Sequence, residues 1–200
     1  MPATDTFYCI GVSYKKADAA LRGRFSITTK AIPFFLEDAK NKCISSLVLS
    51  STCNRTELYA QAPNHVMLVE LLCQHSEGTI EDFEKAGNTY EGAQAISHLF
   101  RVGTGLDSQI LGDFEIISQL KNSFKISKKI NLLSPYMERM FNAVLNASKR
   151  IKTETELSSG ATSVSYVSVR YCWIPFPTWI AKRSCCLVWE KLDVTPVKIL

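Results

Sequence analysis

The sequence predicts an α+β fold, a small sandwich of antiparallel sheet and helices. Apolar, β-prone runs at residues 6–13 and 43–51 predict two strands. A third run at 56–62 alternates between apolar and polar residues, which favours a strand in antiparallel pairing. Hydrophobic residues recur at helical spacing between and after these runs, so helices are expected to cover the sheet.

The elements follow one another in a clear order. TFYCIGVS at 6–13 ends in turn-forming residues and is expected to be the first strand. An amphipathic helix is expected at 28–41, with Thr28 as its N-cap. CISSLVLSS at 43–51 has the character of a buried strand, and TELYAQA at 56–62 follows it.

Helical patterns occupy the rest of the chain up to the tail. They lie at 64–75, at 80–86 and at 92–102, and the pattern from residue 113 onward is entirely helical. Ser134-Pro135 is expected to form the N-cap and first turn of a helix. This strand–helix–strand–strand–helix order is ferredoxin-like, with further helices that run into the start of a long connecting helix.

Composition narrows the class of protein. The 200 residues are 46% hydrophobic and carry a net charge of +4, which excludes disorder and suits one domain and part of a second. No apolar stretch approaches the roughly 20 residues of a membrane helix, and no basic-then-apolar leader opens the chain. The seven cysteines have no regular spacing and are expected to be free thiols. A cytoplasmic protein is therefore predicted.

A polar segment between the second and third strands holds the first candidate for chemistry. It reads SSTCNRTE at 50–57, with Arg55 close to Cys53. A cysteine in a polar turn beside an arginine is prone to form the thiolate that a nucleophile requires. Local composition favours the alternative, a turn with a small buried thiol.

Three further features each allow a structural and a functional interpretation. His98 lies on an apolar helical pattern, where a structural histidine is more common than a catalytic one. The run at 105–113 is either a helix–helix connection or a polar binding wall. Basic residues on two helices either meet phosphates or form solvated faces, and the solvated interpretation is favoured. They are Lys121, Lys125, Lys128, Lys129, Lys149, Arg150 and Lys152.

Taken together, four segments resemble the glutamyl-tRNA reductase family over about residues 6–170. The segments are GVSYKKADAALRGRFSI (11–27), LSSTCNRTELY (49–59), HLFRVGTGLDSQILGDFEIISQLK (98–121) and GATSVSYVSV (160–169). The family enzyme opens the tRNA-dependent five-carbon route to tetrapyrroles. Several motifs in the right order are more specific than a lone cysteine, so the resemblance favours the nucleophile interpretation of Cys53.

The resemblance implies a two-step reaction. Cys53 attacks the ester carbonyl that joins glutamate to tRNA, which gives a thioester and releases the tRNA. Hydride from NADPH then reduces the thioester to glutamate-1-semialdehyde. His98 matches the family's activity-critical histidine near the thiol.

The resemblance also implies substrate-binding residues, and it implies no metal. Arg55 is expected to pair with a substrate carboxylate in a two-pronged contact, and Thr52 and Asn54 to hydrogen-bond the aminoacyl group. The other expected contacts are Ser108, Asp113, Phe114, Glu115 and Gln119. The chain departs from the family in two places, with GDFE at 112–115 for the usual Gly-Glu-Pro-Gln and Tyr14 for a frequent histidine.

The chain is expected to divide into three parts. Residues 1–155 form the N-terminal catalytic domain, and 156–170 begin the connecting helix or linker to an NADPH domain. The tail at 171–200 does not resemble the family and holds no Gly-x-Gly-x-x-Gly, so no cofactor-binding residues are expected in this chain.

A shifted reading frame makes the tail intelligible. In this frame, each codon consists of the last base of one residue's codon and the first two bases of the next. The codons of Trp189 and Glu190 then have to encode a glycine, because TGG followed by GA contains GGA. The neighbouring codons permit the other two glycines of the dinucleotide-binding fingerprint. We therefore hypothesise a frameshift near residues 170–172 that truncates the family protein.

The expected partners follow from the resemblance. They are glutamyl-tRNA, the downstream aminomutase and, through a dimerisation region absent here, a second copy of the chain; no membrane is expected. The 200 residues are expected to form the Cys53 thioester without completing hydride transfer. The alternative is a non-catalytic tRNA- or protein-binding remnant, which the basic helical faces and the missing cofactor domain support.

Overall fold

Four strands form one antiparallel sheet in the computed structural model, which describes residues 5–42, 44–113 and 115–155. The sheet order is β2-β3-β1-β4, so the two central strands are the third and the first along the chain. This order completes the ferredoxin-like arrangement. The strands are β1 (Thr6–Ser13), β2 (Ser46–Ser51), β3 (Arg55–Ala62) and β4 (Gly87–Glu91).

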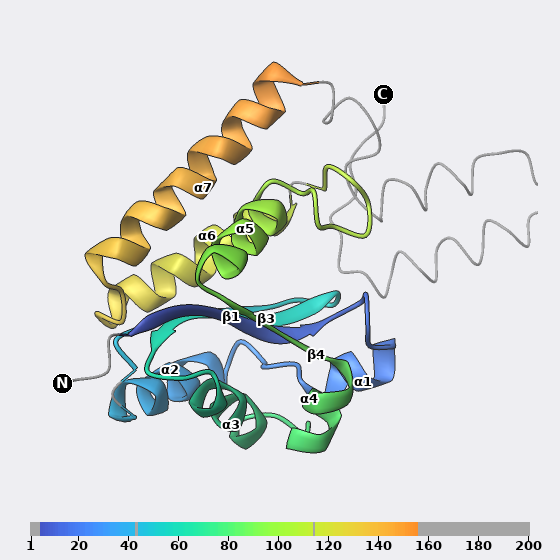
Figure 1. Cartoon of the computed structure of the whole chain (residues 1–200), viewed down its shortest axis with the longest axis vertical. Coiled ribbons are helices and arrows are strands. Elements are labelled where there is room, and N and C mark those ends of the chain that lie inside the picture. Colours follow the sequence, from blue (N-terminus) through green and yellow to red (C-terminus); the bar gives the residue numbers. More distant parts are fainter. Residues whose placement is uncertain (1–4, 43, 114, 156–200) are drawn as a thin grey trace, which may run out of the picture.

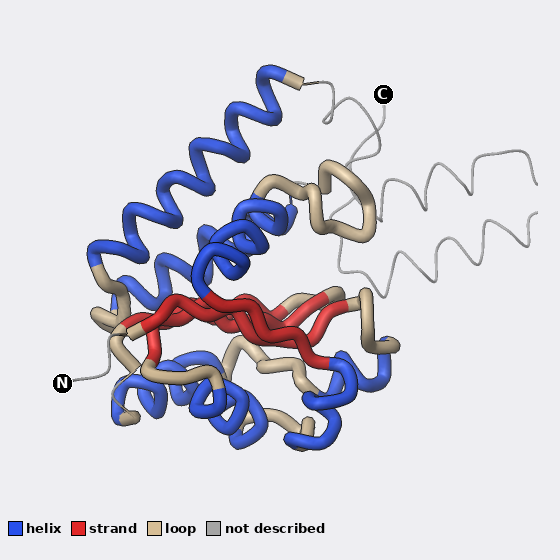
Figure 2. The backbone as a smooth tube through the Cα atoms, in the orientation of Figure 1, coloured by secondary structure: helices blue, strands red, loops and turns tan. Residues whose placement is uncertain are grey.

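Helices cover both faces of the sheet, which gives three layers (Figures 1 and 2). The first four lie on one face, and these are α1 (Ala19–Arg24), α2 (Ile32–Asn41), α3 (Val66–Gln74) and α4 (Ile80–Ala86). The last three lie on the other face, and these are α5 (Gly92–Gly103), α6 (Glu115–Lys129) and α7 (Pro135–Glu154).

The double cover explains why the β1 sequence holds only hydrophobic residues and a glycine from Phe7 to Val12. Side chains alternate between the faces of a strand, so a strand with helices on both sides needs apolar residues at every position. Ile10 and Val12 point into the core beneath α2–α4, whereas Phe7 and Cys9 belong to the core beneath α5–α7. All four side chains are at most 4% exposed.

The predicted strands and most predicted helices are confirmed, with small shifts at their ends. The helix expected at 28–41 begins at Ile32, and its N-cap residue is Ala31, which makes no side-chain cap. Thr28 was therefore wrongly predicted as the cap; its carbonyl, not its hydroxyl, accepts the N–H groups of the next turn. Ser134 does cap α7, since its hydroxyl accepts from Met137 N at 3.1 Å.

Two elements were not predicted, β4 and the short helix α1. β4 reads GNTYE and pairs with β1 at the edge of the sheet formed by the described residues. Its side chains are half-buried or exposed, so it carries no apolar alternation that a sequence pattern can detect. It matters because it leads directly into α5, which carries His98.

The remaining expectations about the ends of the chain fall beyond the described range. The linker expected at 156–170 and the tail at 171–200 lie outside the described residues. Among the helices within 5–42, 44–113 and 115–155, none has the length and apolar character needed to cross a membrane.

Candidate active site

The turn between β2 and β3 presents Cys53 at its tip. The Thr52 hydroxyl accepts from the backbone N–H groups of Asn54 and Arg55, at 3.3 and 3.1 Å. The backbone N–H of Thr52 donates to the Arg55 carbonyl at 2.8 Å, which closes the turn. Cys53 is exposed, and Arg22 Nε donates to its carbonyl at 3.2 Å. The thiol is therefore reachable from solvent on a turn that is held in place.

Three polar side chains share the face of β3 that α5 covers. Arg55, Glu57 and Tyr59 alternate along the strand, so all three project from the same side. Arg55 Nη1 donates to Glu57 Oε1 at 3.2 Å, and the Tyr59 hydroxyl donates to Glu57 Oε2. Arg55 is 2% exposed and Glu57 3%, so each charge depends on the other for compensation.

The loop after α5 adds a second buried carboxylate. Asp107 Oδ2 lies 3.3 Å from both Nη1 and Nη2 of Arg55, and the Asp107 carbonyl also accepts from Nη2. Its other carboxylate oxygen pairs with Lys15 from the loop after β1. Both terminal nitrogens of Arg55 thus contact one carboxylate oxygen of Asp107 within the protein, and a contact of Arg55 with a substrate carboxylate stays a prediction.

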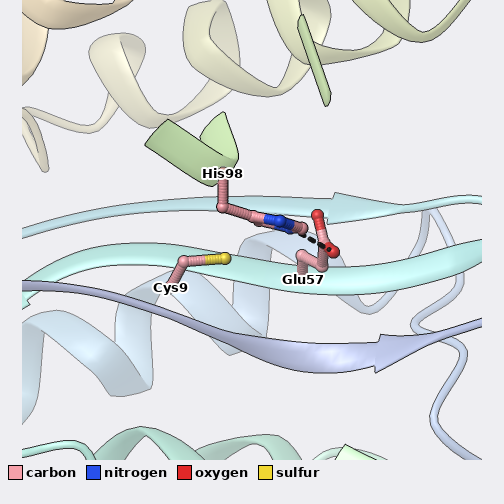
Figure 3. A group of neighbouring side chains, drawn as sticks. All are labelled: Cys9, Glu57 and His98. Carbon is pink, nitrogen blue, oxygen red and sulfur yellow. Dashed lines mark hydrogen bonds and ion pairs between the residues drawn. The ribbon is translucent and has the colours of Figure 1, made fainter. Parts of the chain in front are cut away.

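His98 joins this network from α5. Its Nε2 lies 2.9 Å from Glu57 Oε1, and its ring stacks on Tyr90 of β4 with the centroids 4.4 Å apart. Figure 3 shows the imidazole directed onto the sheet beside Glu57 and Cys9. The ring is therefore held both at its edge and at its face, which fixes its orientation.

The network keeps Glu57 ionised despite its burial. Burial by itself raises the pKa of a carboxyl group, but the hydrogen bond from His98 and the charge of Arg55 outweigh it. With the further hydrogen bond from Tyr59, they lower the pKa of Glu57 from 4.5 to about 2. Burial and the Glu57 charge together raise the pKa of Tyr59, so its hydroxyl remains a donor.

Gly11 has no side chain, and Glu57 occupies the space that a side chain at Gly11 would fill. The two residues are paired across β1 and β3. A Cβ at Gly11 would stand 2.2 Å from the Thr56 carbonyl oxygen and 2.9 Å from Glu57 Cγ, and both distances are too short for real contacts. A glycine is required here because the chain approaches so closely.

A pocket of about 440 Å³ opens beside the network. His98, Tyr90 and Asp107 form part of its wall, and Lys15 and Arg101 bring positive charge to it. The pocket therefore suits a small anionic group. Cys53 does not line it; its link to His98 runs through the chain to Arg55 and from there through Glu57.

The other expected substrate contacts lie around the start of α6. Asp113 Oδ1 accepts from the backbone N–H of Glu115, the first residue of α6, at 2.9 Å, and Ser108 is half-buried beside Asp107. Glu115 and Gln119 are exposed on α6, and Phe114 lies outside the described residues. In the described part of the chain, no hydrogen bond or ion pair joins these positions to Arg55, Glu57 or His98. Their role in substrate binding stays a prediction.

Sequence reasoning missed the residues that hold the network together, Glu57, Asp107, Lys15 and Tyr90. One signal was present, since Arg55, Glu57 and Tyr59 place polar groups at alternate positions of a strand expected in the sheet. No pattern along the chain connects Glu57 with Asp107, because the two residues are fifty positions apart in the sequence.

The fold and this site define a three-layer α+β domain with an exposed thiol next to a buried ion-pair network. The sequence profile of the "Glutamyl-tRNAGlu reductase, N-terminal domain" matches residues 10–155. The glutamyl-tRNA reductase of Flavobacterium psychrophilum is 57% identical over 171 residues, which are 86% of this chain. That of Christiangramia forsetii is 58% identical over 165 residues, or 82% of this chain. Among solved structures, the glutamyl-tRNA reductase from Methanopyrus kandleri has a similar fold, with a TM-score of 0.68 over 83% of this chain at 24% identity.

The chain belongs to the glutamyl-tRNA reductase family. It spans about two fifths of the length of these curated relatives, 41% and 40% respectively, and 39% of the Methanopyrus kandleri chain.

Replacing Glu57 is expected to change how stability depends on pH. A carboxyl whose pKa falls from 4.5 to about 2 on folding stabilises the fold above pH 4.5. That contribution, roughly 3 kcal/mol, disappears as the pH falls towards 2. Glu57→Gln should be less stable than the unmodified chain near neutral pH, and the difference should shrink in acid. Denaturant unfolding at a series of pH values measures this, and two parallel stability curves would contradict it.

Adding a single methyl group at Gly11 is expected to disturb the site through the backbone. Gly11→Ala forces β1 away from Thr56 and Glu57, so we expect a loss of roughly 2–3 kcal/mol in unfolding free energy. Gly23→Ala is the matched control, because a Cβ there meets nothing within 4 Å. Chemical denaturation of both variants is the measurement, and equal stabilities would show that the close approach is not a constraint.

Proposed function

We propose that this chain performs the acyl-transfer step of glutamyl-tRNA reduction, with Cys53 as the nucleophile. The observation that carries the proposal is the exposed Cys53 thiol on a turn fixed by Thr52 and anchored to the network through Arg55. Membership of the family supplies the substrate class, an ester between glutamate and tRNA.

The acyl transfer requires no reactant other than the Cys53 thiol and glutamyl-tRNA. The Cys53 thiolate attacks the ester carbonyl, a carbon–sulfur bond forms, and the bond between the carbonyl carbon and the ribose oxygen breaks. The proton released from the thiol ends on the ribose hydroxyl of the departing tRNA. The product is a glutamyl thioester on Cys53.

The residues around the thiol divide into two roles. The Thr52 hydroxyl is used within the turn, so its role is to hold Cys53 in position. The side chain of Asn54 makes no hydrogen bond with any other described residue, which leaves it available to the aminoacyl group. Arg55 acts from within the protein, because it connects the turn to Glu57 and Asp107.

The pocket beside His98 is the proposed place for the glutamyl side chain. Its free carboxylate is a small anion, and Arg101 provides compensating charge at the pocket wall, together with Lys15, which also pairs with Asp107. Glu57 holds the His98 ring in one orientation, so that its other ring nitrogen remains available for a hydrogen bond to the bound group.

The described residues do not fit NADPH. A dinucleotide needs a glycine-rich turn between a parallel strand and a helix N-terminus, whereas this sheet is antiparallel throughout. The two glycines with positive φ in the loop before α6, Gly105 and Gly112, hydrogen-bond to each other and close that loop on itself. No step of hydride transfer is therefore assigned to these residues.

Replacing the proposed nucleophile should abolish the covalent intermediate. Cys53→Ser is expected to lower the rate of acylation by glutamyl-tRNA roughly thousandfold or more, because a neutral hydroxyl is a far weaker nucleophile than a thiolate. The measurement is mass spectrometry of the intact chain after incubation with charged tRNA, followed by peptide mapping of the glutamyl group. Cys53 is exposed, so the variant should retain the fold.

Cys73→Ser is the matched control, since Cys73 lies half-buried on α3. It should acylate at the unmodified rate. An unmodified chain that binds tRNA but never acquires a glutamyl group would support the binding-remnant alternative instead. Formation of glutamate-1-semialdehyde by these 200 residues on addition of NADPH would contradict the cofactor assignment.

The frameshift hypothesis belongs to the same proposal and has its own test. Residues 171–200 lie outside the described part of the chain. Sequencing the encoding DNA through codons 170–200 should reveal a Gly-x-Gly-x-x-Gly fingerprint in another frame. If no alternate frame encodes it, the tail is a divergent segment and the hypothesis is wrong.

A further inference from the structure

Three side chains with metal-binding atoms meet beneath α5 (Figure 3). The Cys9 sulfur, a Glu57 carboxylate oxygen and a His98 ring nitrogen all lie within 4.8 Å of one another. They come from β1, β3 and α5, elements that are fixed against each other by strand pairing and by the core. We propose that Cys9, Glu57 and His98 form a binding site for a divalent metal ion of the zinc class.

The kinds of ligand select the class of ion. A thiolate, an imidazole and a carboxylate are the three ligand types that Zn²⁺ uses, whereas Mg²⁺ and Ca²⁺ require oxygen ligands. Ligand atoms around a tetrahedral zinc ion lie about 3.5 Å apart, given bond lengths of about 2.0–2.3 Å. The ligand atoms, which lie within 4.8 Å of one another, therefore have to approach by at most roughly an ångström when the ion binds.

The surroundings hold the ligands in place. The Glu57 carboxylate is oriented by Arg55 and Tyr59, and the His98 ring by its stacking on Tyr90. Such contacts behind the ligands are what a metal site needs to keep its geometry. Cys9 is 1% exposed, and its thiol has no hydrogen-bond partner among the described residues.

Access comes from the pocket next to His98. The His98 side chain is 10% exposed and forms part of that pocket's wall, whereas Cys9 and Glu57 are buried. An ion enters from the pocket side, and a water molecule from the pocket completes the fourth coordination position. Three protein ligands with one water is a common arrangement for zinc.

Protons and charges balance when the ion binds. The Cys9 thiol releases its proton to solvent, and His98 carries its ring proton on Nδ1 so that Nε2 is free to bind. The Glu57–His98 hydrogen bond is replaced by one metal bond from each residue. The thiolate and the carboxylate together neutralise the ion, and Asp107 continues to balance Arg55 nearby.

The test is titration of the reduced 200-residue chain with Co²⁺, a spectroscopic substitute for Zn²⁺. We expect one tightly bound ion per chain with a sulfur-to-cobalt charge-transfer band, which Zn²⁺ displaces. Cys9→Ala should lose the band and weaken binding at least roughly hundredfold, because it removes a ligand. Cys53→Ser and Cys73→Ser change an exposed and a half-buried thiol. Both variants should retain the charge-transfer band and the tight binding of Co²⁺.

A second ligand variant provides the test if the Cys9→Ala chain does not fold. His98→Gln removes a different ligand and leaves Cys9 in place, so it should also lose tight binding. Zn²⁺ should raise the unfolding temperature of the unmodified chain and of Cys73→Ser, but of neither ligand variant, because it binds only the folded site. Tight Co²⁺ binding with the sulfur band in either folded ligand variant overturns the proposal. So does an unmodified chain that binds Co²⁺ no better than these variants.

Discussion

One buried carboxylate, that of Glu57, connects the parts of the molecule that form the site. It accepts hydrogen bonds from two residues of its own strand and lies 2.9 Å from His98 on α5. Through Arg55 it also connects to Asp107 in the loop after that helix. If the carboxylate were removed, the buried guanidinium would keep Asp107 as its charged partner among the described residues, and the His98 ring would lose the contact at its edge.

The two faces of the sheet show that this network is not there for stability alone. The face beneath α2–α4 is covered by an apolar core. Among the described residues, the ion pairs with both side chains at most 4% exposed, Arg55–Glu57 and Arg55–Asp107, lie on the opposite face. The opposite face combines apolar residues such as Leu99 and Phe141 with Arg55, Glu57 and Asp107. Apolar residues of similar volume often serve as well as a buried salt bridge, so the charges are better explained by what they position. They position His98 and the base of the Cys53 turn.

Most of the fold was predictable because its signals are local. The apolar run of β1 and the Ser134-Pro135 start of α7 each lie within one short segment. β4 was not predictable from periodicity, because an edge strand with half-buried side chains shows no alternation. In the site, Cys53 and His98 were found through motifs, whereas Glu57 and Asp107 were not. Their importance arises from contacts across 41 and 52 residues of sequence, which only the folded chain brings together.

Two cysteines of this domain show how position decides what a thiol can do. Cys53 lies exposed in a turn, where a large substrate can reach its sulfur. Cys9 lies beneath α5, where burial and the nearby charge of Glu57 raise its pKa well above the usual value. A thiolate at Cys9 would be a second negative charge beside a buried carboxylate, which a cation bound between them would offset. The two thiols therefore differ in access and in the charges around them, and the proposed nucleophile at Cys53 and the proposed metal ligand at Cys9 depend on these properties.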